Sequence, residues 1–85
     1  MSFLNITYAG ISGDYPLDAG INLTDSDVRR IAVEVVRAGG VRGMAFPQLS
    51  ENAFEHYVVD RFTSARGERR IYLRPKVPFG GRRSA

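Results

Sequence analysis

The segment from Thr24 to Gly40 carries the strongest structural signal in the sequence, because it has the start, the end and the periodicity of one helix. Thr24 and Asp27 have the spacing of a capping box, in which two side chains satisfy backbone amides at a helix start. Apolar residues recur three and four positions apart. The apolar set is Val28, Ile31, Ala32, Val35 and Val36, while Arg29, Arg30, Glu34 and Arg37 fall largely on the other faces. Since Gly39 marks the end, we predict a helix over about residues 25–38 that needs packing on a sheet for stability.

Two β-rich segments precede the helix. Residues 3–8 contain the β-branched and aromatic side chains expected of a strand. The glycines and the aspartate of residues 9–14 indicate a hairpin connection, and residues 15–18 are predicted to form a shorter second strand. Because Pro16 has no amide donor, we expect this second strand at a sheet edge.

Two more β-rich segments follow the helix. Residues 54–63 and 69–74 predict the third and fourth strands, and the segment 41–51 reads as a partly buried loop. The order strand, strand, helix, strand, strand predicts an α+β protein with one helix on a mixed sheet, the ubiquitin-like β-grasp arrangement, ββαββ. A ferredoxin-like alternative needs a second helix, which residues 47–60 would have to supply.

The last strand has two different faces, because strand residues alternate between the sides of a sheet. The apolar side is Ile71 and Leu73, and the other side is Arg70, Tyr72 and Arg74. We expect the second set on an exposed sheet face, where these three residues are our candidates for partner binding. Pro75 then ends strand pairing. We predict one domain over residues 1–76 and a flexible arm over residues 77–85.

Composition excludes several classes of function. The chain has 85 residues, enough for one domain, and contains no cysteine, which excludes disulfides, thiolate metal sites and cysteine catalysis. His56, the lone histidine, has no partners at metal-ligand spacing and is expected at a solvent-facing strand position. We therefore expect no catalytic site, no metal and no cofactor. There is no signal-peptide pattern and no apolar run near the ~20 residues of a membrane span, so we expect a cytoplasmic protein without a membrane partner.

The positive charge is concentrated toward the end of the chain and consists almost entirely of arginine. The net charge is +3, and eleven of the twelve basic residues are arginine. A nucleic-acid-binding module is therefore one alternative, with phosphates held by Arg66, Arg69, Arg70, Arg74, Lys76, Arg82 and Arg83. Tyr72 or Phe79 would then offer a stacking face. No known nucleic-acid-binding motif accompanies these residues.

The arm contains the pair Gly80-Gly81, one of two glycine doublets in the chain. Its position just after the last strand is what carries information. Two residues without a Cβ atom can pass through a narrow enzyme channel that a side chain would block. We therefore take Gly80 and Gly81 as the candidate site of processing and conjugation. Val77, Pro78 and Phe79 are expected to hold the arm extended against a partner.

Short motifs along the chain resemble one family. They are Tyr8 with Gly10, Leu17-Asp18, Thr24 four positions before Val28-Arg29, Ala53-Phe54-Glu55, and Tyr72 and Arg74 before Gly80-Gly81. A chain with these motifs resembles the small ubiquitin-like proteins of bacterial PRTRC-type gene clusters, called PRTRC protein C. The resemblance extends over most of the sequence and implies a β-grasp protein modifier.

The resemblance also implies partners. Such proteins are encoded with an activating-type, ThiF-like enzyme, a conjugating-type enzyme and a JAB-class metalloprotease. It implies that a terminal glycine carboxylate is adenylated and passed on to a target protein. In this sequence Arg82-Arg83-Ser84-Ala85 follow Gly81, so a peptidase has to cut after Gly81 first. Two alternatives stay open: a non-covalent β-grasp adaptor or inhibitor of a protein partner, and the nucleic-acid binder described above.

Overall fold

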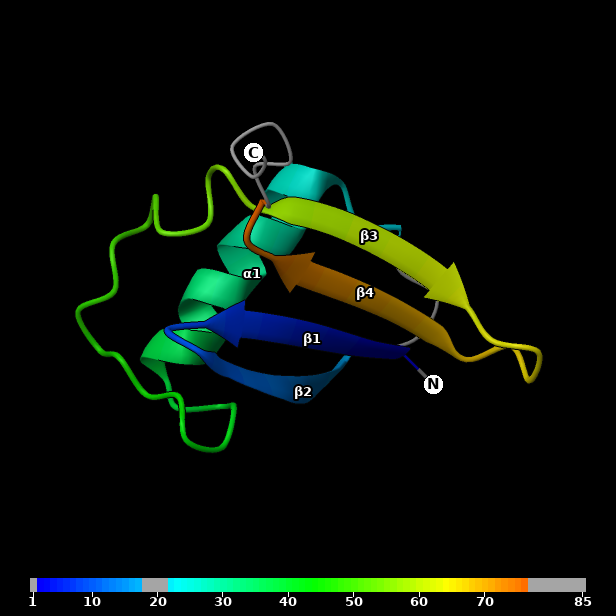
Figure 1. Cartoon of the computed structure of the whole chain (residues 1–85), viewed down its shortest axis with the longest axis horizontal. Coiled ribbons are helices and arrows are strands. Elements are labelled where there is room, and N and C mark those ends of the chain that lie inside the picture. Colours follow the sequence, from blue (N-terminus) through cyan, green and yellow to red (C-terminus); the bar gives the residue numbers. More distant parts are fainter. Residues whose placement is uncertain (1, 18–21, 77–85) are drawn as a thin grey trace, which may run out of the picture.

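In a computed structural model, which describes residues 2–17 and 22–76, one α-helix lies against one face of a four-stranded sheet (Figure 1). The elements are β1 (Ser2–Tyr8), β2 (Ile11–Leu17), α1 (Asp25–Arg37), β3 (Val58–Thr63) and β4 (Arg69–Arg74). The strand order is β2-β1-β4-β3, with β1 parallel to β4 and the other two pairs antiparallel. The prediction of an α+β protein with a mixed sheet is confirmed. The ferredoxin-like alternative is wrong, because the described residues between α1 and β3 form no second helix.

The first hairpin is tighter than predicted. Its turn is Ala9-Gly10, with φ angles of 52° and 80°, and two positive φ values are typical of a two-residue hairpin turn. Residues 11–14, predicted to be a connection, belong to β2, where Ile11 lies opposite Tyr8. The buried side chain of Val41 occupies the space that a Cβ on Gly13 would need. The expected edge position of the strand containing Pro16 is confirmed.

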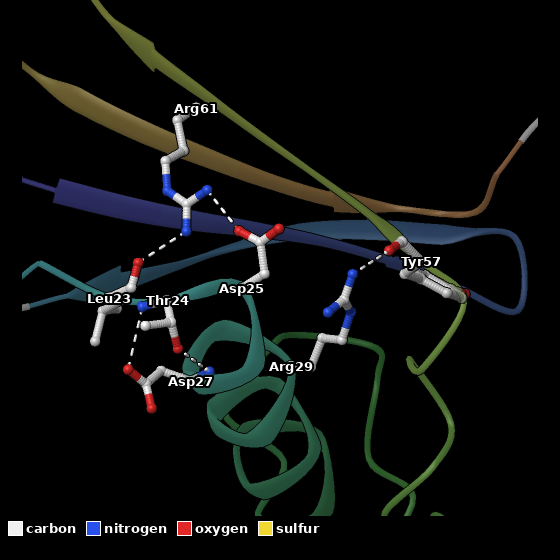
Figure 2. A network of polar contacts seen from close by, with 7 residues as sticks. All are labelled: Leu23, Thr24, Asp25, Asp27, Arg29, Tyr57 and Arg61. Carbon is white, nitrogen blue, oxygen red and sulfur yellow. Dashed lines mark hydrogen bonds and ion pairs between the residues drawn. The ribbon is translucent and has the colours of Figure 1, made fainter.

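The predicted capping box at the start of α1 is confirmed. The Thr24 hydroxyl accepts a hydrogen bond from the Asp27 backbone N–H at 3.0 Å, and the Asp27 carboxylate accepts one from the Thr24 N–H at 3.1 Å (Figure 2). The Asp27 carboxylate also pairs with Arg30 at 2.8 Å. These bonds stabilise the charged carboxylate and hold the pKa of Asp27 below its ordinary value.

An arginine of β3 fastens the start of the helix to the sheet. Arg61 donates to the Asp25 carboxylate at 2.7 Å and to the Leu23 carbonyl at 2.8 Å (Figure 2). Asp25 lies in the first turn of α1, where a negative charge also complements the helix dipole. One side chain therefore fixes where the helix begins relative to an edge strand.

The segment from residue 38 to residue 57 packs along α1 and widens its buried side. Val28, Ala32, Val35 and Val36 are buried as predicted, but Val33 is buried as well and Ile31 is half-buried. Arg29 and Arg37, which flank Val33 at four-residue spacing, donate to carbonyls of this segment. The bonds are Arg29 to Tyr57 at 2.9 Å (Figure 2) and Arg37 to Leu49 at 2.8 Å. This side of the helix lies outside the predicted apolar stripe, and its two arginines hold the loop in place.

The third strand begins later than predicted. β3 starts at Val58, and residues 51–56 form turns closed by hydrogen bonds between residues three positions apart. Phe54, expected in the strand, is fully buried in the core. His56 is exposed as expected but lies in a turn beside Glu55. Phe54 packs edge-on to both Tyr8 and Tyr57. A loop residue therefore contributes an aromatic ring to the core.

Candidate functional site

The sheet face opposite α1 is the best-defined surface of the described residues. Figure 1 views the sheet from this side, with α1 behind the strands. The pairing registers and the alternation of strand residues place twelve side chains on it. We call this surface the open face; its residues are Phe3, Asn5 and Thr7 of β1, Ser12, Asp14 and Pro16 of β2, Val58, Asp60 and Phe62 of β3, and Arg70, Tyr72 and Arg74 of β4.

Aromatic rings and guanidinium groups alternate across the middle of the open face. The Arg70 guanidinium lies 5.0 Å from the centre of the Phe3 ring, and the Arg74 guanidinium lies 5.3 Å from that of Tyr72. Tyr72 also contacts Phe62 edge-on, with ring centres 5.5 Å apart. Rings and planar guanidinium groups packed in this way form a surface that offers both apolar and polar contacts.

Both arginines of the open face are paired with carboxylates. Two nitrogens of Arg74 donate to one oxygen of Asp60, at 2.8 and 3.2 Å. Arg70 donates to Glu68 at 3.0 Å and lies 3.5 Å from Asp14. The hydrogen bond to Glu68 stabilises the charged guanidinium and raises the pKa of Arg70 above its ordinary value. Two cations thus lie among three carboxylates, and the centre of this face carries no excess of positive charge.

Exposed apolar surface also concentrates here. Among the described residues, the two large apolar side chains that count as exposed are Val58 at 37% and Phe62 at 54%, and both belong to β3. The alternation of the strand places both on the open face. Phenylalanine, tyrosine and arginine are the residue types that protein–protein interfaces favour. The open face therefore gathers several residues of the types that protein–protein interfaces favour.

The structure brings together part of the predicted site. Arg70, Tyr72 and Arg74 share the open face, as their alternation predicts. Sequence reasoning missed Phe3 and Phe62, which lie on either side of Arg70 in one row across the sheet. Phe3 lies between two buried residues of β1, which was a usable signal, whereas Phe62 lies between two exposed residues of β3. Placing the two in one row required the pairing registers. The predicted arm residues Val77, Pro78, Phe79, Gly80 and Gly81 lie outside the described residues.

The basic residues proposed to hold phosphates do not form one stripe within the described part of the chain. Arg70 and Arg74 lie on the open face and are paired with acids. Arg69 alternates to the opposite side of β4, and Arg66 lies in the turn before it. Lys76 follows the far end of the strand, up to about 23 Å from Arg69 at ~3.3 Å per residue. Arg82 and Arg83 lie outside the described residues.

A metal centre has no support in the described residues. Residues 2–17 and 22–76 contain no group of three histidine, aspartate or glutamate side chains placed to hold a metal ion. The imidazole of His56 has Glu55 as its acidic neighbour, at 3.1 Å, and projects into solvent. Across the same residues, no helix combines the length and apolar character needed to cross a membrane.

Comparison of the chain with protein-family models, curated proteins and solved structures gives no match. No relative therefore assigns a role to the open face or to the arm.

Proposed function

We propose that this chain is a ubiquitin-like protein modifier with a β-grasp fold. The observation that carries the proposal is the path of the chain through the sheet. β4 lies between β1 and β3, runs parallel to β1 and ends at Arg74, and Pro75 and Lys76 are exposed beyond it. The next residues in the sequence lead to Gly80-Gly81. A mixed sheet covered by one helix, followed directly by a glycine-paired arm, is the arrangement that a modifier requires.

The proposed chemistry places the reacting group on this chain and the catalytic groups on its partners. A peptidase, of JAB class or another kind, hydrolyses the Gly81–Arg82 bond and frees the Gly81 carboxylate. A ThiF-like activating enzyme joins this carboxylate to AMP from ATP, with release of pyrophosphate, and a cysteine thiol then displaces AMP to give a thioester. After transfer to a conjugating-type enzyme, an amine of the target displaces the thiol and an amide bond forms.

In this proposal the open face is the surface by which partners recognise the modifier. Tyr72 and Phe62 offer exposed aromatic contact, and Arg74 is held over Tyr72 by its bonds to Asp60. A surface whose polar groups are already oriented loses less conformational entropy on binding than one with free side chains. Val77, Pro78 and Phe79 would add contacts along the arm.

A pair of variants in the native host tests the proposal. Gly81→Val places a branched side chain at the proposed cut and should abolish species of higher mass that carry this chain. Arg83→Ala, two residues further on, should leave them unchanged because it lies in the segment that is removed. Immunoblotting of a tagged chain measures both. Equal patterns of higher-mass species for the two variants would contradict conjugation through Gly81.

A non-covalent adaptor or inhibitor is the second candidate, and the open face supports it as well. A surface of aromatic rings and acid-paired arginines suits a protein partner whether or not a covalent bond follows. The two roles differ in what they require of the arm. An adaptor would retain its function after Gly81→Val and lose it after Tyr72→Ala, whereas a modifier would be inactivated by either change.

A nucleic-acid-binding role is less well supported by the same surface. Phosphate binding requires arginines that are free to replace counterions, and Arg70 and Arg74 are engaged with Asp14, Asp60 and Glu68. If the chain bound DNA through its described arginines, affinity would fall steeply with salt concentration. We expect DNA binding to be weak. Neither Arg70→Ala nor Arg74→Ala should much change the slope of log affinity against log salt concentration.

A further inference from the structure

An open apolar groove lies at the end of the sheet where β1 finishes, away from the open face. Its volume is about 610 Å³, and its lining includes Tyr8, Phe46, Pro47, Leu49 and Ala53. The rings of Tyr8 and Phe46 meet edge-on, with centres 5.3 Å apart. None of the described residues that line the groove is charged. Such a lining suits aromatic and aliphatic side chains.

The register of the sheet brings the end of β4 to this groove. β1 and β4 run parallel, with Ile6 opposite Leu73. Extending this register by two residues puts Tyr8 level with Pro75, the first residue after β4. The chain that follows β4 therefore leaves the sheet at the end where Tyr8 lines the groove.

The sequence that leaves the sheet at this point has the complementary chemistry. Lys76 is followed by Val77-Pro78-Phe79, and this apolar triplet is flanked by a lysine on one side and by glycines and arginines on the other. Three extended residues span up to about 10 Å. Phe79 can therefore lie about 10 Å from Lys76, which is close enough for a side chain to enter a groove at the same end of the sheet.

We propose that Val77–Phe79 of the same chain docks in this groove, with the Phe79 ring against Tyr8 and Phe46. Docking does not depend on the modifier role, because it requires the groove and the apolar triplet alone. If the modifier role also holds, docking would bring Gly80-Gly81 against the folded domain and restrict access of the processing peptidase to them.

Nuclear Overhauser contacts in the full chain of 85 residues test this docking directly. We expect contacts from the Phe79 ring protons to the Phe46 ring and to the Ala53 methyl group. Phe79→Ala should remove them and shift the amide signals of Tyr8, Phe46 and Ala53, while those of Asn5 and Asp14 on the open face stay in place. Arg83→Ala is the matched control and should shift none of these groove signals.

Three results would overturn the proposal. One is the absence of contacts between the Phe79 ring and the groove in the full chain. Another is contact of Phe79 with Tyr72 or Phe62 on the open face. The third is that the contacts appear between a labelled and an unlabelled molecule in a mixed sample and disappear on dilution, which would assign the groove to a second copy. Persistence of the groove contacts within one molecule at low concentration is the expected result.

Discussion

Ala9 adopts a backbone conformation that its side chain disfavours. A substitution at this position can therefore increase the stability of the protein. Its φ of 52° lies in the left-handed region, where a residue with a Cβ is strained by about 1–2 kcal/mol. Asparagine tolerates this conformation and is favoured before glycine in two-residue hairpin turns. Ala9→Asn should raise the free energy of unfolding by about 1 kcal/mol in urea titration. Ala65→Asn, at an exposed turn residue without a positive φ, should have little effect.

The side chain of Thr24 contributes to stability through one hydrogen bond. Its hydroxyl accepts from the Asp27 backbone N–H, which has no partner inside the helix. Thr24→Ala should lower the free energy of unfolding by about 1 kcal/mol, as is typical when a helix loses its N-cap. Ser26→Ala, in the same turn and exposed, is the control. Equal losses for both variants in denaturant titration would show that the cap is not formed in solution.

Asp27 makes a contribution that depends on pH. The pKa of its carboxylate in the folded protein lies below the ordinary value of 3.8 because of its bonds to Thr24 and Arg30. The unfolded chain therefore takes up this proton first as pH falls. The stabilisation is present above the ordinary pKa and is lost as pH drops through the folded-state value. The loss of stability caused by Asp27→Asn, measured by urea titration, should be largest above pH 3.8 and should shrink as the pH falls below that value. A cost independent of pH would contradict the assignment.

At the scale of helices and strands, the elements that could be predicted from the sequence are those with a clear periodicity of apolar residues and a clear boundary signal. α1 and the two-sided β4 were predictable because each has a complete period and a clear boundary, the capping box in one and Pro75 in the other. The open-face trio of Arg70, Tyr72 and Arg74 followed from that alternation. The aromatic neighbours Phe3 and Phe62 could not be added, because they join the trio through pairing registers that no local pattern encodes.

The errors occur where tertiary contacts override local preference. Gly13 was interpreted as a turn residue because glycine favours turns, yet it is required in β2 for the close approach of Val41. Residues 54–57 have strand-forming side chains but form turns, because Phe54 is buried by packing against Tyr8 and Tyr57. Val33 was not part of the predicted apolar stripe, because the loop that covers it has no periodicity of its own.

Two phenylalanines, one in the core and one on the open face, should differ in their contribution to stability. Phe54 is fully buried although it lies in a loop, whereas Phe62 is 54% exposed on β3. Phe54→Ala should lower the free energy of unfolding by about 3–5 kcal/mol, the usual range for a buried aromatic. Phe62→Ala should cost less than about 1.5 kcal/mol, mainly through its contact with Tyr72. Thermal unfolding of both variants measures the difference. A larger loss for Phe62→Ala would contradict this description of the core.

At the scale of the whole molecule, two surfaces bear on the proposed function, the open face and the apolar groove. The open face collects the exposed aromatic and apolar groups and balances its arginines with carboxylates, which favours a protein partner. The apolar groove lies at the end of the sheet where the chain leaves β4. A modifier needs both a surface for recognition and a reactive end whose accessibility can change, and this arrangement would supply both.

The most direct test of the modifier proposal is the intact mass of the protein recovered from its native host. We predict a species that lacks Arg82-Arg83-Ser84-Ala85 and ends at Gly81, together with heavier species in which Gly81 is joined to a target amine. A single mass that retains Arg82–Ala85, with no heavier species under any growth condition, would contradict the proposal and favour the non-covalent adaptor.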